Sequence, residues 1–180
     1  MRTTRLAHLT DAMQKKRLIR FGNPFDSDTI TAYVQAIGPQ FFLAAIVNDD
    51  IWLNGFACFR ITDIRKLSPE PYADFIEQAL KKRRQKIPAI PHIDLSNISA
   101  LLTSANQAYP LITIYQERLD PDICQIGRIV DMHRSHVSLL RIRPGAVWDD
   151  TADCYKLRDI TRLAFGGDYE DALYLVAKKL

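Results

Sequence analysis

The stretch Cys58-Phe59-Arg60-Ile61-Thr62-Asp63-Ile64-Arg65-Lys66-Leu67 occurs a second time as Cys154-Tyr155-Lys156-Leu157-Arg158-Asp159-Ile160-Thr161-Arg162-Leu163. Each position is shifted by 96, and the same shift relates residues 31–67 to residues 127–163 without a gap. The two segments share eight identities in 37 positions. Average amino-acid usage would give only about two or three. The sequence therefore indicates a tandem duplication.

The bulk composition is that of a folded protein. Of the 180 residues, 47% are hydrophobic and 25% are charged, which is typical of globular domains. A duplicated chain of this length predicts two units of roughly 85–90 residues each. We place them at residues 1–86 and 87–180 and expect them to pack together as one compact body.

The sequence predicts a cytoplasmic protein without a membrane partner. No run approaches the roughly 18 apolar residues of a spanning helix. The first residues, Met1 to Arg5, are not followed by the apolar core of a signal peptide. Three cysteines, Cys58, Cys124 and Cys154, are too few and too scattered for a disulfide framework, so we expect reduced thiols.

Apolar periodicity predicts a helix, five strands and a closing helix in the first unit. The first helix should cover residues 4–14, and the strands residues 15–21, 29–37, 41–47, 51–61 and 64–67. Gly55 is the expected site of a bulge in the long fourth strand. The closing helix, residues 72–82, carries apolar residues at helical spacing, and a linker follows over residues 83–91.

The second unit is expected to repeat this order of helices and strands. A helix over residues 94–108 precedes strands over residues 111–117, 123–132, 136–142, 154–157 and 160–165, and a closing helix covers residues 169–178. Side chains alternate along a strand, so one face of the repeated motif should be buried. The residues expected on that inner face are Phe59, Ile61, Tyr155 and Leu157, with Arg60 and Lys156 on the other.

Five short, closely joined strands, with a long bent fourth and a very short last one, are typical of a small barrel. The strand spacing resembles that of an Sm-like or SH3-like barrel, and the tandem arrangement is similar to a family of uncharacterised bacterial proteins. The resemblance covers nearly the whole chain. It implies a mainly β fold with flanking helices (α+β), built from two tandem five-stranded barrels, each followed by a helix.

The RNA-binding residues of Sm proteins are not matched. Those proteins carry an Asn in the second strand and a late Arg-Gly turn. Where that turn would fall, this chain has Arg60-Ile61-Thr62-Asp63-Ile64. The resemblance therefore implies a fold and does not bring RNA binding with it.

Two pairs of repeat-equivalent residues are candidate sites. Asp63 and Asp159 could be catalytic carboxylates, but the surrounding motif offers only basic neighbours, and an Asp between short strands usually accepts N–H bonds from its turn. Trp52 and Trp148 could stack on bases or bind a peptide. Large aromatic residues are more often core residues. We interpret all four as structural anchors of the repeat.

A metal site is conceivable around His133 and His136, with Cys124 one strand away. The repeat places Ile37 and Gln40 at the positions of the two histidines, and no fourth ligand is evident. We therefore predict no metal site.

The strongest charge run is Lys81-Lys82-Arg83-Arg84-Gln85-Lys86. Residues 1–92 contain 14 Lys and Arg against 9 Asp and Glu, and residues 93–180 contain 10 against 12. A basic run can contact phosphates, although it also solvates a linker and suits a helix C-terminus. The second interpretation of this run is therefore contact with nucleic acid through Lys81, Lys82, Arg83, Arg84 and Lys86.

The nucleophile-elbow, P-loop, dinucleotide-binding and zincin motifs are all absent from the sequence. We therefore expect no enzyme and no cofactor. The first hypothesis is a non-enzymatic interaction module for a protein partner or for self-association, because small barrels leave edges and loops that suit partners. The alternative is binding of RNA or another nucleic acid through the basic first half and linker.

Overall fold

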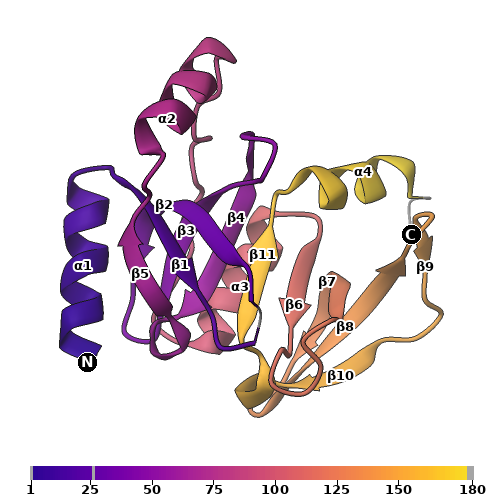
Figure 1. Ribbon diagram of the computed structural model, residues 1–180. Coiled ribbons are helices and arrows are strands. Elements are labelled where there is room, and N and C mark those ends of the chain that lie inside the picture. The colour runs from indigo at the N-terminus through magenta and orange to yellow at the C-terminus, as the bar shows by residue number, and fades with distance from the viewer. Residues whose placement is uncertain (1, 26, 178–180) are drawn as a thin grey trace. The chain divides into compact units, whose positions relative to one another are not determined.

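The computed structural model describes residues 2–25 and 27–177. The chain divides into two compact units, residues 1–90 and 91–180. Each is rich in antiparallel strands and carries helices beside them (Figure 1). Across the described ranges, no helix is both long enough and apolar enough to cross a membrane. That the two units form one cooperative body stays a prediction.

In the part of the first unit that the structure describes there are two helices and five strands, with a single 3₁₀ turn between the last two strands. In chain order they are α1 (Arg2–Gln14), β1 (Leu18–Gly22), β2 (Thr29–Ile37), β3 (Phe41–Val47), β4 (Leu53–Arg60), η1 (Ile61–Asp63), β5 (Arg65–Pro69) and α2 (Ala73–Lys82). The predicted strands over residues 29–37 and 41–47 are confirmed to the residue. The bulge expected at Gly55 is also confirmed: its φ is 67°, and the β3–β4 register shifts beside it.

The strands of the first unit follow the order β4-β3-β2-β1-β5, and every pairing is antiparallel. One face of this sheet is closed by aromatic packing. The rings of Phe21 and Phe59 meet edge-on at 5.0 Å, and those of Phe42 and Phe59 stack at 5.6 Å. Phe59 is 6% exposed and Ile61 is 2% exposed, so the burial predicted for these two residues is confirmed. In the second copy of the motif Leu157 is buried, whereas Tyr155 is only half-buried, contrary to the prediction.

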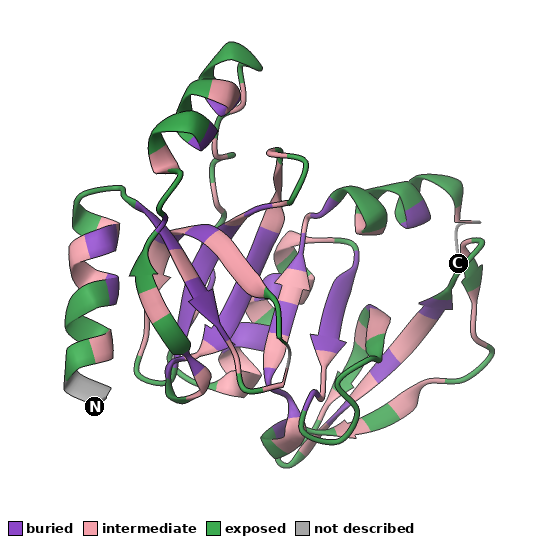
Figure 2. Cartoon of the chain, viewed as in Figure 1, coloured by how far each residue is buried: buried purple, intermediate pink, exposed green. Residues whose placement is uncertain are grey.

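The two helices cover different parts of the first unit (Figure 2). Helix α1 buries Leu9 and Ala12 and packs against β2, β5 and η1. Helix α2 places Ile76 and Leu80 against Leu18 of the sheet, in a cluster that also contains Val47, Tyr33, Ile51, Leu53 and Ala73. Burying each such aliphatic side chain contributes about 1.5–3 kcal/mol, which fixes α2 on this face of the sheet.

Within the described residues, the second unit contains two helices and six strands, with one 3₁₀ turn between the last two strands. In chain order they are α3 (Ile98–Ala108), β6 (Ile112–Tyr115), β7 (Cys124–Met132), β8 (His136–Arg143), β9 (Val147–Trp148), β10 (Asp153–Lys156), η2 (Leu157–Asp159), β11 (Arg162–Phe165) and α4 (Asp168–Val176). The sequence predicted no separate strand at β9, which pairs with β8 through Ile142 and Trp148.

The second unit repeats the strand order of the first, as β10-β8-β7-β6-β11. Its β7–β8 pairing brings two backbones so close that a side chain at Gly127 would meet the Leu140 carbonyl oxygen at 2.2 Å. Helix α3 is fastened to β7 by one amide: Asn106 Oδ1 accepts the Ile129 N–H at 2.7 Å. Helix α4 places Leu173 against Leu111 and Ile142.

The prediction of two closed five-stranded barrels is wrong. Closure requires the first and last strands of the order to pair. In the first unit β4 and β5 stand at opposite ends of the order, and in the second unit β10 and β11 do, with no pairing between them among the described strands. The short turns η1 and η2 redirect the chain to the far side of the sheet, onto β1 and β6. Each unit is an open antiparallel sheet.

Candidate functional site

The basic run of residues 81–86 lies at the end of α2 and in the segment that follows it. Lys81 and Lys82 belong to the last turn of the helix, and Arg83 is its C-cap. Lys81, Arg84 and Lys86 line a pocket in the first unit. Lys82 is exposed outside that lining. The run is therefore divided between the pocket and its surroundings.

The end of α2 is closed by a Schellman motif. The N–H of Gln85 donates to the Leu80 carbonyl at 2.9 Å, and the N–H of Arg84 donates to the Lys81 carbonyl at 3.0 Å. This motif needs a left-handed backbone at the residue after the cap, a position that glycine usually fills. Here it is Arg84, with φ 56°. A left-handed conformation costs an L-residue about 1–2 kcal/mol.

The end of α1 has the same construction. The N–H of Arg17 donates to the Ala12 carbonyl at 2.9 Å, and the N–H of Lys16 donates to the Met13 carbonyl at 3.2 Å. Lys16 takes the left-handed position with φ 50°. Lys16 lines the same pocket as Arg84. Among the described residues, three cations occupy left-handed positions that favour glycine: Lys16, Lys66 and Arg84. Two of them, Lys16 and Arg84, line this one cavity.

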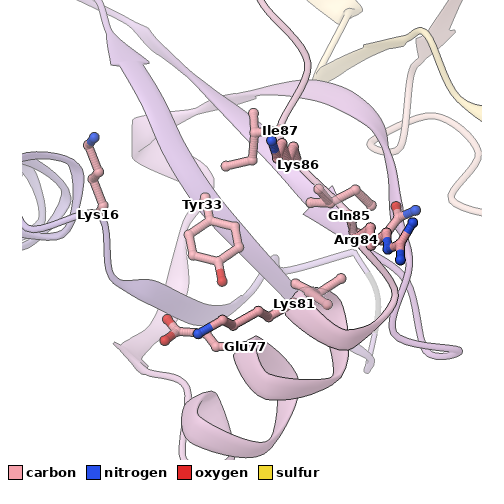
Figure 3. A pocket seen from close by; sticks show the side chains of 10 residues that line it. Lys16, Tyr33, Glu77, Lys81, Arg84, Gln85, Lys86 and Ile87 are labelled. Carbon is pink, nitrogen blue, oxygen red and sulfur yellow. The ribbon is translucent and has the colours of Figure 1, made fainter.

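The pocket has a volume of about 820 Å³ and opens beside α2 on the face of the sheet that this helix covers (Figure 3). Its apolar wall consists of Leu53, Leu80 and Ile87. Its basic residues are Lys16, Lys81, Arg84 and Lys86, and Tyr33, Glu77 and Gln85 complete the lining. The cavity lies in the range of ligand pockets, about 300–1,000 Å³.

The arrangement of the charges follows from helix geometry. Glu77 and Lys81 are spaced at i and i+4, so they lie along one side of α2, whereas Arg84 follows the C-cap of the helix with a left-handed backbone. Lys16 lies on the other side of Tyr33 in Figure 3. Four cations and one carboxylate give this pocket a positive field that attracts anions.

Tyr33 forms the centre of the pocket. It comes from β2, where it pairs with Leu18 and Ala45. Burial, the charge of Glu77 and a hydrogen bond to the Glu77 side chain together raise the pKa of Tyr33 to about 12. The phenol therefore stays protonated at neutral pH and donates to the Glu77 carboxylate.

Arg83 makes contacts away from the pocket. Its guanidinium lies 4.4 Å from the centroid of the Trp52 ring. Its Nη1 donates to the carbonyls of Asp50 at 2.5 Å and Ile51 at 2.8 Å. These contacts fasten the end of α2 to the turn between β3 and β4. Arg83 is thus a positioning residue for the basic segment.

Trp52 is 40% exposed under this arginine. Its repeat equivalent, Trp148, packs beside the Leu111 cluster of the second unit, with Arg128 at 5.4 Å from its ring. Asp63 and Asp159 each end a 3₁₀ turn, η1 and η2, between two strands. All four residues predicted as repeat anchors therefore lie outside the pocket.

The residues considered for a metal site do not come together. Cys124 begins β7, whereas His133 follows the end of the same strand, so about 30 Å of extended chain separates them. His133 and His136 stack at 4.1 Å, and His133 Nε2 lies 3.0 Å from Asp131. Within the described part of the chain, no group of three or more His, Cys, Asp and Glu is arranged to hold a metal.

A smaller hollow of about 240 Å³ lies between α1, β1 and β5. Its acidic residue, Asp11, pairs with Lys15 and with Arg17 at 3.5 Å. The hydrogen bond from Lys15 lowers the pKa of Asp11. Because these charges are paired with one another, this hollow has no net attraction comparable to that of the larger pocket.

Sequence reasoning missed Lys16, Tyr33 and Glu77 as members of a site. Lys16 carried one usable signal, since it follows the last apolar residue of a predicted helix, where a left-handed cap is expected. Tyr33 and Glu77 lie in a strand and a helix whose packing the sequence did not specify.

The chain was compared with family models, curated proteins and solved structures, and none of them matches it. The functional argument therefore depends on the pocket itself.

Proposed function

We propose that the protein is a non-catalytic binding module for single-stranded nucleic acid and that the pocket beside α2 is its contact site. The observation that carries this proposal is the placement of Lys16 and Arg84. Each occupies a left-handed position that glycine favours, and strained positions of this kind concentrate at functional sites. Both line one cavity together with Lys81 and Lys86.

A single strand suits this geometry better than a duplex does. The basic residues surround a hollow of about 820 Å³, and such a hollow can accept one splayed nucleotide. Bases of a single strand are free to leave the stack, whereas those of a duplex are paired. The apolar wall of Leu53, Leu80 and Ile87 offers a surface for a base or sugar, while the cations meet phosphates.

The experiment is fluorescence anisotropy of a labelled single-stranded RNA at several salt concentrations. Neutralising a cation that contacts phosphate should lower the slope of log affinity against log salt by about 0.7. We expect this result for Lys16→Ala and Lys81→Ala. The matched controls are Lys15→Ala and Lys82→Ala, whose lysines are sequence neighbours outside the pocket lining. If all four variants behaved alike, the pocket would not be the contact site.

A second candidate function is association with a protein or with another copy of the chain. The observation that favours it is on α4, where Leu175 is 86% exposed and Val176 is 71% exposed. Adjacent apolar side chains this exposed are unusual outside interaction surfaces. Sedimentation of the wild type and of a Leu175→Ser, Val176→Ser variant tests it. A concentration-dependent assembly that the variant loses is the expected result.

Neither candidate function, nucleic-acid binding or protein association, includes a chemical step or needs a cofactor. The cytoplasmic location expected from the sequence belongs to the same proposal.

A further inference from the structure

Glu77 is the carboxylate in the lining of an otherwise cationic pocket. It is exposed on α2, and its partner Tyr33 reaches it from β2. A pocket serving only to attract phosphate would bind more tightly without this negative charge. Lys81 follows Glu77 by four residues, but an exposed ion pair at that spacing contributes little to stability. Glu77 therefore remains available to a ligand.

A carboxylate in this position selects for hydrogen-bond donors. Ionised Glu accepts hydrogen bonds and donates none. The Tyr33 hydroxyl occupies one acceptor position of the carboxylate, and its remaining lone pairs can accept further hydrogen bonds. Charge-assisted hydrogen bonds of this kind are about twice as strong as neutral ones.

Among the four RNA bases, guanine matches such an acceptor best. Its Watson–Crick edge presents the N1–H and the N2 amino group side by side, two donors at the spacing of a carboxylate. Adenine and cytosine each place one amino donor beside a ring nitrogen that would repel the carboxylate. Uracil has a single N–H between two carbonyl oxygens. Proteins read unpaired RNA bases on this edge.

We propose that the pocket beside α2 prefers guanine, with the Glu77 carboxylate accepting the guanine N1–H and N2–H and with Tyr33 holding that carboxylate in place. This inference rests on the proposed function. The cations on either side of Tyr33 (Figure 3) take the phosphates of the same strand, and Leu53, Leu80 and Ile87 form the apolar wall for the base.

The test is anisotropy with labelled uridine oligonucleotides that carry one central guanosine, inosine, adenosine or cytidine. A bidentate base contact discriminates by about 1–3 kcal/mol, so we expect the guanosine strand to bind about ten-fold more tightly than the others. Inosine lacks the N2 amino group and should bind with intermediate affinity. All measurements use the full chain, with circular dichroism confirming that each variant is folded.

Glu77→Gln should abolish the guanosine preference and at the same time tighten binding of the all-uridine strand, because it removes a negative charge. Asp74→Asn is the matched control, since Asp74 lies on the same helix outside the lining, and it should keep the preference. Equal wild-type affinity for all bases, or a guanosine preference that survives in Glu77→Gln, would overturn the guanine assignment while leaving nucleic-acid binding in place. If the wild type bound none of the strands, both proposals would fail.

Discussion

Lys16 and Arg84 hold the same position relative to two different helices. Each is the first residue past a helix cap, each has a left-handed backbone with φ 50° and 56°, and each lines the pocket centred on Tyr33. The local sequence would be more stable with glycine at both positions. Both residues are cations, and both line one cavity. The two strained backbone positions therefore also supply positive charge to the pocket.

The first prediction separates that strain from the charge. Arg84→Gly and Arg84→Ala both remove the guanidinium, but only glycine adopts the left-handed backbone without penalty. Relief of about 1–2 kcal/mol, offset by about 0.5–1 kcal/mol for the greater flexibility of unfolded glycine, should make Arg84→Gly more stable than Arg84→Ala by about 1 kcal/mol. Urea unfolding measures this difference.

In the same two variants, RNA affinity should fall equally, because both lack the charge. A stable Arg84→Gly protein with weakened RNA binding would show that Arg84 increases RNA affinity and lowers the stability of the fold. Full RNA affinity in Arg84→Gly would contradict the role assigned to this side chain.

The second prediction concerns the aromatic core of the first unit. Phe59 packs against Phe21 and Phe42, so Phe59→Asp would bury an unpaired charge and should unfold the unit. Tyr155, the repeat equivalent, is only half-buried, and Tyr155→Asp should be tolerated better. Thermal unfolding followed by circular dichroism compares the two. Similar melting of Phe59→Asp and the wild type would refute the inward assignment.

This contrast shows how far the sequence determines the fold. Alternation and turn residues predicted β2 and β3 to the residue, because these signals are local. Whether a sheet closes depends on which strands meet at its ends, a long-range outcome that spacing does not encode, so the barrel prediction was wrong. The same repeat motif also gives Phe59 and Tyr155 different burial, since the neighbours of each differ.

The site was predictable only in part, for a related reason. The charge run identified Lys81, Arg84 and Lys86, which line the pocket, because these basic residues are close together in the sequence. It could not separate these residues from Arg83, whose side chain leaves the pocket for Trp52. Lys16 joins the cluster from another helix, and only the packing of α1 and α2 on the sheet brings it there.

The third prediction tests Arg83 as a positioning residue. Its planar fork donates to the Asp50 and Ile51 carbonyls while it covers Trp52, a combination that lysine cannot reproduce. Arg83→Lys should therefore destabilise the protein by about 1 kcal/mol. In a Trp148→Phe background, where Trp52 is the remaining tryptophan, it should also change the fluorescence.

The RNA readout distinguishes positioning from direct contact. Arg83→Lys should weaken binding with an unchanged salt slope, because no phosphate contact is lost, whereas Arg84→Ala should lower that slope. A reduced slope in an Arg83→Ala variant would place Arg83 on the nucleic acid and contradict its assignment to Trp52.

The fourth prediction uses the titration of Tyr33. Burial first, then the charge of Glu77 and the hydrogen bond to it, raise the pKa of Tyr33 to about 12, while in the unfolded chain a tyrosine ionises near pH 10. The raised pKa stabilises the folded state fully below about pH 10, and this contribution is lost as the pH rises toward 12. Wild-type stability should therefore fall more steeply than that of Tyr33→Phe across this interval.

Absorbance of the tyrosinate form measures the titration directly. Burial also raises the pKa of Tyr115 to about 12 and raises the pKa values of Tyr109 and Tyr155. Tyr33→Phe should therefore remove one of these late-titrating tyrosines and leave the others as internal references. Glu77→Gln should lower the pKa of Tyr33 but leave it above that of a free tyrosine, because burial, its largest cause, persists. An unchanged late titration in Glu77→Gln would mean that Tyr33 and Glu77 are not coupled, and the argument that Tyr33 orients the carboxylate toward a base would then fail.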